Sequence, residues 1–186
     1  MMKPYLLSFL VFLFISSLLA QGGNVFSTTS GKISFQSDAP FELIKASSKE
    51  VKGLLDPAKK TFAFKVRMES FQGFNSALQK EHFNENYVES NKYPDASFSG
   101  KIIEDTDFTN DGNYTIRAKG NFTVHGVSQE RIIKSDMTVK EGKINIHSAF
   151  TVMLTDHNIP IPKVVKDKLA DEIKVDVTCL LEARKS

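Results

Sequence analysis

The sequence predicts an all-β protein of antiparallel strands with one or two short helical interruptions. Three observations predict it. Apolar and polar residues alternate along several stretches, as side chains on opposite faces of a strand do. Turn-forming pairs such as Asp56-Pro57 and Glu141-Gly142 separate these stretches. Only two segments, 76–94 and 162–173, depart from the alternation. This pattern is typical of a barrel or a two-sheet sandwich, and periodicity alone does not choose between them.

The N-terminal segment is predicted to lie outside the folded domain. MMKPYLLSFLVFLFISSLLAQ carries an early cation, Lys3, then an apolar run that ends in small residues. This layout is typical of a secretory signal peptide, with cleavage after Ala20. The run is shorter than the ~20 residues of a spanning helix, so we expect export, periplasmic or extracellular, and no stable membrane anchor. Residues 21–186 would then form a single domain.

The expected strands follow from the alternation, in chain order. Ile33 and Phe35 open the first strand. The next runs to Met68 and has one face made of Phe62, Phe64, Val66 and Met68. A long strand begins at Gly112 and is expected to run through His125, with one dry face made of Tyr114, Ile116, Ala118, Gly120, Phe122 and Val124. A further strand presents Phe150 and Val152, and the last one holds Cys179. Asp111-Gly112 and Glu141-Gly142 are expected to close hairpins.

Two segments show helical rather than strand spacing. Ser76–Pro94 places His82, Phe83 and Tyr87 roughly on one helical face, which predicts a short, irregular helix that ends before Pro94. In Pro162–Ile173, a proline at the first helical position and the pair Val165 and Leu169 predict a helical turn or two.

Charge and motifs exclude several functional classes. The net charge is +2 and no basic stripe is present, so no nucleic-acid partner is expected. No Gly-x-Ser-x-Gly and no glycine-rich phosphate loop occurs, so we expect no catalytic residues and no enzyme. The four histidines form no paired ligand motif, so no metal site is expected. They are interpreted as surface or interface residues, His125 and His147 on outward strand faces and His82 and His157 in irregular segments.

Three segments together carry a family resemblance. The stretch 78–100 contains His82, Phe83, Tyr93, Pro94 and Phe98. The stretch from Gly120 runs into a turn through Phe122, Val124, Gly126, Val127 and Ser128. The end, from Phe150 to Ala183, has a Phe-led strand, a loop and a final alternating strand. In order and spacing these segments resemble the YceI-like family of exported proteins.

The resemblance implies an extended, lipocalin-like antiparallel barrel of eight strands whose interior binds a long apolar molecule, typically a polyisoprenoid. One departure concerns the penultimate strand, where many members carry an arginine and then Asp-aromatic-Gly. This chain reads Leu154-Thr155-Asp156-His157-Asn158 there, so only the aspartate remains. We expect the chemistry of this loop to differ from that of the family, and the bound molecule to differ as well.

The resulting hypothesis is an exported protein that binds a lipid in the barrel. No cofactor is expected beyond a bound isoprenoid or quinone-like lipid. One alternative is a barrel with a filled core that acts through its surface, and a second is a quinone container that uses His82 or Asp156. Whether two chains pair as a homodimer is left open. The residues expected to contact the lipid are Phe64, Val66, Met68, His82, Phe83, Tyr87, Tyr114, Ile116, Phe122, Val124, Phe150 and Val152.

Overall fold

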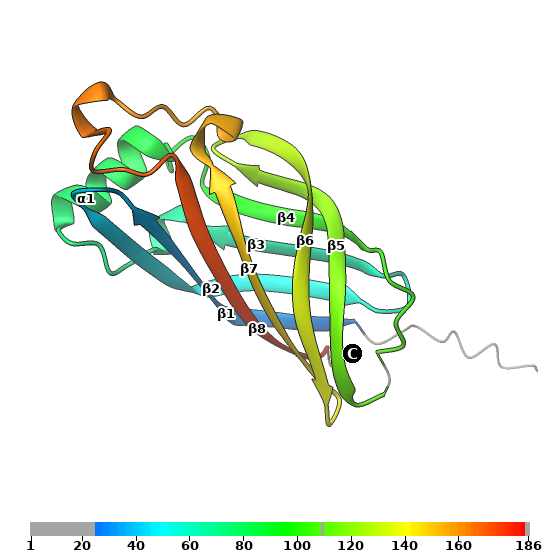
Figure 1. Ribbon diagram of the computed structural model, residues 1–186. Coiled ribbons are helices and arrows are strands. Elements are labelled where there is room, and N and C mark those ends of the chain that lie inside the picture. Colours follow the sequence, from blue (N-terminus) through cyan, green and yellow to red (C-terminus); the bar gives the residue numbers. More distant parts are fainter. Residues whose placement is uncertain (1–24, 109, 185–186) are drawn as a thin grey trace, which may run out of the picture.

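Eight antiparallel strands pair in chain order and close into a barrel when β8 meets β1. The computed structural model describes residues 25–108 and 110–184, and the expected signal peptide, residues 1–20, lies outside them. Figure 1 shows the eight strands arranged around the barrel. This topology confirms the all-β prediction and decides between the two architectures in favour of the barrel. The strands are β1 (Phe26–Asp38), β2 (Leu43–Asp56), β3 (Thr61–Arg67), β4 (Asp95–Ile102), β5 (Gly112–Val124), β6 (Val127–Lys140), β7 (Lys143–Met153) and β8 (Glu172–Ala183).

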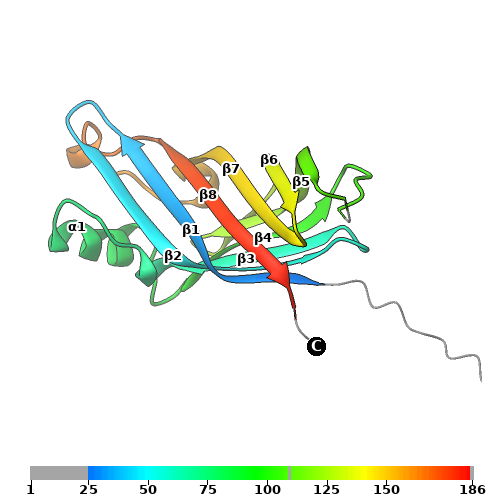
Figure 2. The ribbon, with the colours of Figure 1, turned by 90° about the horizontal axis from the view of Figure 1, so that it is seen from below.

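The helical pieces gather at one end of the barrel (Figure 2), which we call the mouth end. Both predicted helical segments are confirmed: the first is a short α-helix followed by a π-helical turn that ends before Pro94. Phe26 pairs with Ala183, so the described chain begins and ends at the opposite end. The pieces are η1 (Met68–Ser70), α1 (Ala77–His82), η2 (Phe83–Tyr87), η3 (Leu154–His157) and η4 (Lys163–Val165).

The tight hairpins at Glu141-Gly142 and His125-Gly126 have the same turn chemistry. Both residues of each pair have positive φ, between 51° and 72°, as a two-residue turn between twisted strands requires. The first turn was predicted. The second corrects a prediction: β5 ends at Val124, so His125 does not lie on an outward strand face. Its half-buried ring donates from Nδ1 to the His157 carbonyl and lies 2.7 Å from a Glu89 carboxylate oxygen through Nε2.

The connection between β4 and β5 also differs from the prediction. The two strands pair, but Asp111 ends a longer loop, residues 103–111, and does not form a tight turn with Gly112. The loop stays long because it folds back over the barrel end. It buries Phe108 against the ring of Tyr114, and the Tyr114 hydroxyl donates to the Asn110 carbonyl. Burial of the Phe108 ring therefore outweighs the local preference of Asp111-Gly112 for a tight turn.

Two glycines face each other where β4 pairs with β5. Gly100 faces Gly120 across the sheet. A Cβ atom on Gly120 would lie 2.1 Å from the Ser99 carbonyl oxygen, and one on Gly100 would lie 2.1 Å from the Lys119 carbonyl oxygen. Only glycine leaves room for two backbones this close, which lets the wall bend sharply here.

Candidate functional site

The interior of the barrel contains two apolar cavities that lie end to end. The inner cavity has a volume of about 110 Å³ and the outer one, toward the mouth end, about 150 Å³. Four residues line both of them, so the cavities meet at one constriction: Ile33, Val66, Ala96 and Phe122. Together the cavities form a single path along the barrel.

The inner cavity is lined almost entirely by apolar side chains. Alternation along the strands sends aliphatic and aromatic side chains inward from all eight of them. Ser135 and Ser148 both point inward, and their hydroxyls hydrogen-bond to each other at 2.7 Å. Beyond this cavity the narrow end is solid, since Ile144 and Leu181 are fully buried there. A guest would therefore meet hydrocarbon along the inner half of the path.

Aromatic rings form the wall of the outer cavity. Phe83 of η2 stacks on Phe35 of β1, with ring centroids 5.3 Å apart and planes 20° apart. Phe71 and Phe74, in the segment between η1 and α1, complete the cluster at centroid distances of 5.9 and 5.0 Å from Phe83. Such rings give a smooth surface for a hydrocarbon chain and need no polar partner.

The outer cavity has polar groups near the surface, besides the buried Ser37, whose hydroxyl accepts from the Ala170 N–H. Tyr87 and Gln79 line it there, and Gln79 Nε2 donates to a Glu42 carboxylate oxygen at 2.8 Å. Burial, and to a smaller extent the charge of Glu42, raises the pKa of Tyr87, so its hydroxyl stays protonated at neutral pH. These groups can donate to and accept from the polar end of a guest.

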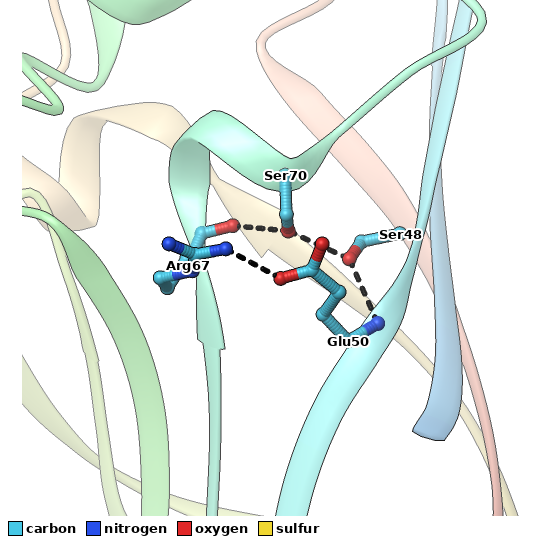
Figure 3. Close-up of polar contacts among 4 residues, drawn as sticks. All are labelled: Ser48, Glu50, Arg67 and Ser70. Atoms are coloured by element: carbon cyan, nitrogen blue, oxygen red, sulfur yellow. Dashed lines mark hydrogen bonds and ion pairs between the residues drawn. The ribbon is translucent and has the colours of Figure 1, made fainter. Parts of the chain in front are cut away.

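A chain of hydrogen bonds closes the wall where β2 and β3 part. Their pairing stops at Lys52 and Lys65, and β2 then faces η1 instead. Figure 3 shows the link between them. The Glu50 backbone N–H donates to Ser48 Oγ, which lies 2.6 Å from Ser70 Oγ, and Ser70 Oγ donates to the Arg67 carbonyl. Since Ser70 gives its proton to that carbonyl, Ser48 must donate to Ser70.

An ion pair lies outside this chain of hydroxyls. The Arg67 guanidinium is 2.8 Å from a Glu50 carboxylate oxygen, and both side chains are largely exposed. A pair this exposed contributes little to stability, because water screens the attraction. The buried part of the link is the Ser48 hydroxyl, which joins β2 to η1 through Ser70.

Ten of the twelve residues expected to contact a lipid line one of the two cavities. Tyr114 does not, because its ring packs on Phe108 beneath the loop 103–111. His82 does not either, because its side chain is exposed on α1. The inner cavity is lined by Phe64, Ile116 and Phe150, and the constriction by Val66 and Phe122. The outer cavity is lined by Met68, Phe83, Tyr87, Val124 and Val152.

Sequence reasoning missed the aromatic wall contributed by Phe71 and Phe74. They lie in a connecting segment that follows neither a two-residue nor a helical period, so alternation gives no signal there. A usable signal is their spacing of three just before Ser76, whose side chain accepts from the Gln79 N–H and so caps α1. Such a cap fixes where the helix begins, so the two rings precede a predictable helix start.

His157 corrects a second histidine prediction, because it is fully buried and does not lie at the surface. Its Nδ1 donates to the Val127 carbonyl at 3.0 Å, and its ring meets Phe122 edge-on at 5.3 Å. It replaces the aromatic residue of the family's Asp-aromatic-Gly pattern. The next residue, Asn158, has a φ of 55°, a conformation that asparagine tolerates where the family carries glycine. The expected departure in sequence therefore places a buried ring at His157 and a left-handed residue at Asn158.

The buried imidazole predicts a pH dependence of folding stability. Burial lowers the pKa of His157 below its ordinary value of 6.5, more than the Val127 hydrogen bond raises it. As pH falls below 6.5, the unfolded chain binds a proton here that the folded chain does not, so the free energy of unfolding should decrease. The decrease ends once pH is below the lowered pKa. Urea unfolding between about pH 7.5 and pH 5 measures it.

His157→Asn is the test variant, because asparagine keeps a donor near the Nδ1 position and does not titrate. Its free energy of unfolding should change less over this pH range than that of the wild type. His82→Asn, at an exposed position, should behave as the wild type does. Hydrogen bonds from Arg117 lower the pKa of Glu104, so this carboxylate takes up its proton at a more acidic pH than an ordinary glutamate does. Equal slopes in the wild type and His157→Asn would contradict the prediction.

The residues described show no arrangement typical of an active site or a metal centre. Within residues 25–108 and 110–184, no group of three or more His, Cys, Asp or Glu side chains is placed to hold a metal ion. Cys179 is buried, and burial raises the pKa of its thiol to about 11, so it is protonated and unreactive at neutral pH. His82 and Asp156, which a quinone container would use, are exposed and line neither cavity. In the same part of the chain, no helix is long and apolar enough to cross a membrane.

Residues 21–181 match the model of the YceI-like domain family. No curated protein has a sequence that matches this chain. Among solved structures, the chain is similar to a polyisoprenoid binding domain from Saccharophagus degradans implicated in plant cell wall breakdown. The TM-score is 0.73 at 11% identity, over 87% of this chain and 99% of that domain.

Two further structures share the fold. BcnA of Burkholderia cenocepacia superposes with a TM-score of 0.67 at 14% identity, over 82% of this chain and 96% of BcnA. The Campylobacter jejuni YCEI protein gives a TM-score of 0.60 at 18% identity, over 77% of this chain and 86% of that protein. At these identities the likeness concerns the barrel and not the identity of a ligand.

Proposed function

This chain belongs to the YceI-like family, and from that premise we propose that its barrel binds a single long apolar lipid of the isoprenoid type. One observation carries the proposal: the inner and outer cavities lie end to end and are almost wholly apolar. A globular domain normally fills its core to high density, so an apolar path of this kind indicates a guest.

We propose an orientation for the lipid from the way the two cavities are lined. Its tail would lie in the inner cavity, toward the solid narrow end at Ile144 and Leu181. Its polar end would lie in the outer cavity near Tyr87 and Gln79, where polar groups reach the surface. The opposite orientation would bury the polar end beside Ser135 and Ser148, whose hydroxyls are already paired.

The energetics need no catalytic or covalent step. Moving ten methylenes from water into the cavities is worth about 8 kcal/mol, at roughly 0.8 kcal/mol each, before the cost of immobilising the chain. Binding would thus come from the length of the tail more than from the headgroup. We also propose that the protein is exported and works outside the cytoplasm, where it keeps its lipid away from water; residues 1–20 support this through their signal-peptide layout.

Native mass spectrometry tests the proposal. The protein is expressed with residues 1–20 in a bacterium that makes isoprenoid lipids, and it is purified without detergent. We expect one adduct for each protein chain, and an organic extract that contains an apolar chain of the same mass. A bare protein that also fails to take up added polyprenol and fatty acids would contradict the proposal and favour a barrel that acts through its surface.

A further inference from the structure

The most exposed large apolar side chains of the described residues gather at the mouth end. Val164 is 88% exposed, Phe41 78% and Leu78 58%. They belong to three separate segments: η4, the β1–β2 connection and α1. Leu43, beside Phe41 at the start of β2, adds a fourth at 46%. We call these four residues the mouth rim.

Hydrogen bonds tie the three segments of the mouth rim into one surface. The Phe41 N–H donates to the Asp167 carbonyl at 3.0 Å, which joins the β1–β2 connection to the segment after η4. The Asn75 amide donates to the Leu43 carbonyl at 3.1 Å, and Gln79 donates to Glu42, which joins the same connection to α1. The apolar tips are therefore held together around the opening of the outer cavity.

The mouth rim also carries positive charge. Lys163, Lys166 and Lys168 surround Val164, and Asp167 is the one acid of residues 162–170, while Glu42 and Glu81 lie near the other three tips in sequence. Lys80 follows Leu78 on α1. None of these four lysines forms an ion pair within the part of the chain that the structure describes; on the barrel wall the lysines at 65, 119 and 143 are paired and those at 52 and 134 are not. These cations are thus free to meet a negative surface.

We propose that the mouth rim docks on the surface of an anionic lipid bilayer, and the proposal rests on the proposed function. Apolar side chains with lysines beside them are what binds an interfacial protein to anionic lipid, through shallow insertion and charge attraction. A protein partner would instead favour a contiguous apolar patch depleted in charge. Docked in this way, the mouth opens into the bilayer, and a lipid tail passes between cavity and membrane without crossing water.

Vesicle flotation tests the docking. We expect the purified protein to float with vesicles of phosphatidylcholine mixed with phosphatidylglycerol, much less with phosphatidylcholine alone, and less at high salt. Val164→Asp places a charge at the most exposed tip and should weaken binding about tenfold. Lys163→Glu with Lys166→Glu reverses two charges at the surface and should weaken it by at least about tenfold.

Matched control variants lie on the barrel wall. Ile132 on β6 is 57% exposed and far in sequence from the rim, so Ile132→Asp should bind vesicles as the wild type does. Lys52→Glu with Lys134→Glu reverses two charges on outward strand positions and should have little effect. A wild type that ignores the mixed vesicles, or controls that weaken binding as much as the rim variants, would overturn the docking proposal.

Lipid content separates this proposal from the proposed function. None of the rim substitutions changes a residue that lines a cavity. Native mass spectra of the same preparations should therefore show the adduct in the wild type and in every variant. Adduct without vesicle binding overturns the docking alone, and vesicle binding without any adduct overturns the proposed function. If sedimentation shows a dimer that Val164→Asp dissociates, the rim is an interface between two copies, and the docking proposal is wrong.

Discussion

Phe122→Glu is expected to abolish lipid retention. The Phe122 ring lies at the constriction, lines both cavities and contacts the rings of Phe98, Phe150 and His157. A carboxylate in its place must either lose its hydration beside a hydrocarbon tail or bring water into the path. Either effect costs several kcal/mol, which lowers the affinity for an apolar chain about a hundredfold or more.

The measurement is the ratio of lipid-bound to bare protein in native mass spectra. The control is Asn121→Glu, which adds the same charge one residue earlier, on the exposed face of β5, and should keep the lipid. Phe122→Leu keeps an apolar side chain and should retain most of it, so this variant separates polarity from shape. A folded Phe122→Glu protein that carries lipid at the wild-type level would show that the path through the constriction is not the binding site.

Gly120→Ala is expected to destabilise the fold strongly, as is the same change at Gly100, which faces it. The new Cβ would lie 2.1 Å from the Ser99 carbonyl oxygen and 2.9 Å from Gly100 Cα. Both obstacles are backbone, so no side-chain rotation relieves the clash and β4 must move away from β5. Overpacking of this kind costs about 3 kcal/mol, which lowers Tm by roughly 6 to 12 °C in a domain of this size.

Thermal and urea unfolding measure the effect. Gly53→Ala provides a graded comparison, because its Cβ would meet only the ring of Phe64, a side chain that can turn aside. Gly142→Ala meets nothing within 4 Å, and only its φ of 72° opposes the change, at a cost of about 1 kcal/mol. Equal losses for Gly120→Ala and Gly142→Ala would show that β4 and β5 do not need the glycine pair.

The sequence was informative wherever one face of a strand is apolar without interruption. The dry face of β5 alternates cleanly from Tyr114 to Val124, and the structure places it inward. β2 gives a weaker pattern, because it presents Ala46, Ser48 and Gly53 inward, and a register shift beside Gly31 interrupts its pairing with β1. Alternation could not reveal such a strand, since small and polar residues face the interior there. β6 was obscured in another way, by the exposed Ile132 on its outward face.

The candidate site was predictable where strand periodicity assigns its residues, as the strands themselves were. Strand residues such as Ile116 and Val152 could be assigned to the interior by periodicity alone. The mouth end could not, because its geometry depends on contacts between distant segments. His157 shows this: nothing near it in sequence indicates burial, which comes from the Val127 carbonyl and the Phe122 ring on other strands. His82 was assigned to the opening for its helical spacing, yet α1 presents it to solvent.

The seam between β1 and β8 has a consequence for how the chain folds. These strands come from opposite ends of the described sequence, and contacts such as Ser37 to Ala170 join residues 133 positions apart. Such high contact order slows folding, because the two ends must lose conformational entropy to meet before their pairing stabilises the barrel. Until β8 arrives, β1 and β7 are open edges that can recruit other chains. A chain that is synthesised or exported N-terminus first can therefore complete its barrel only after residue 183 has emerged. It depends on protection from aggregation until then.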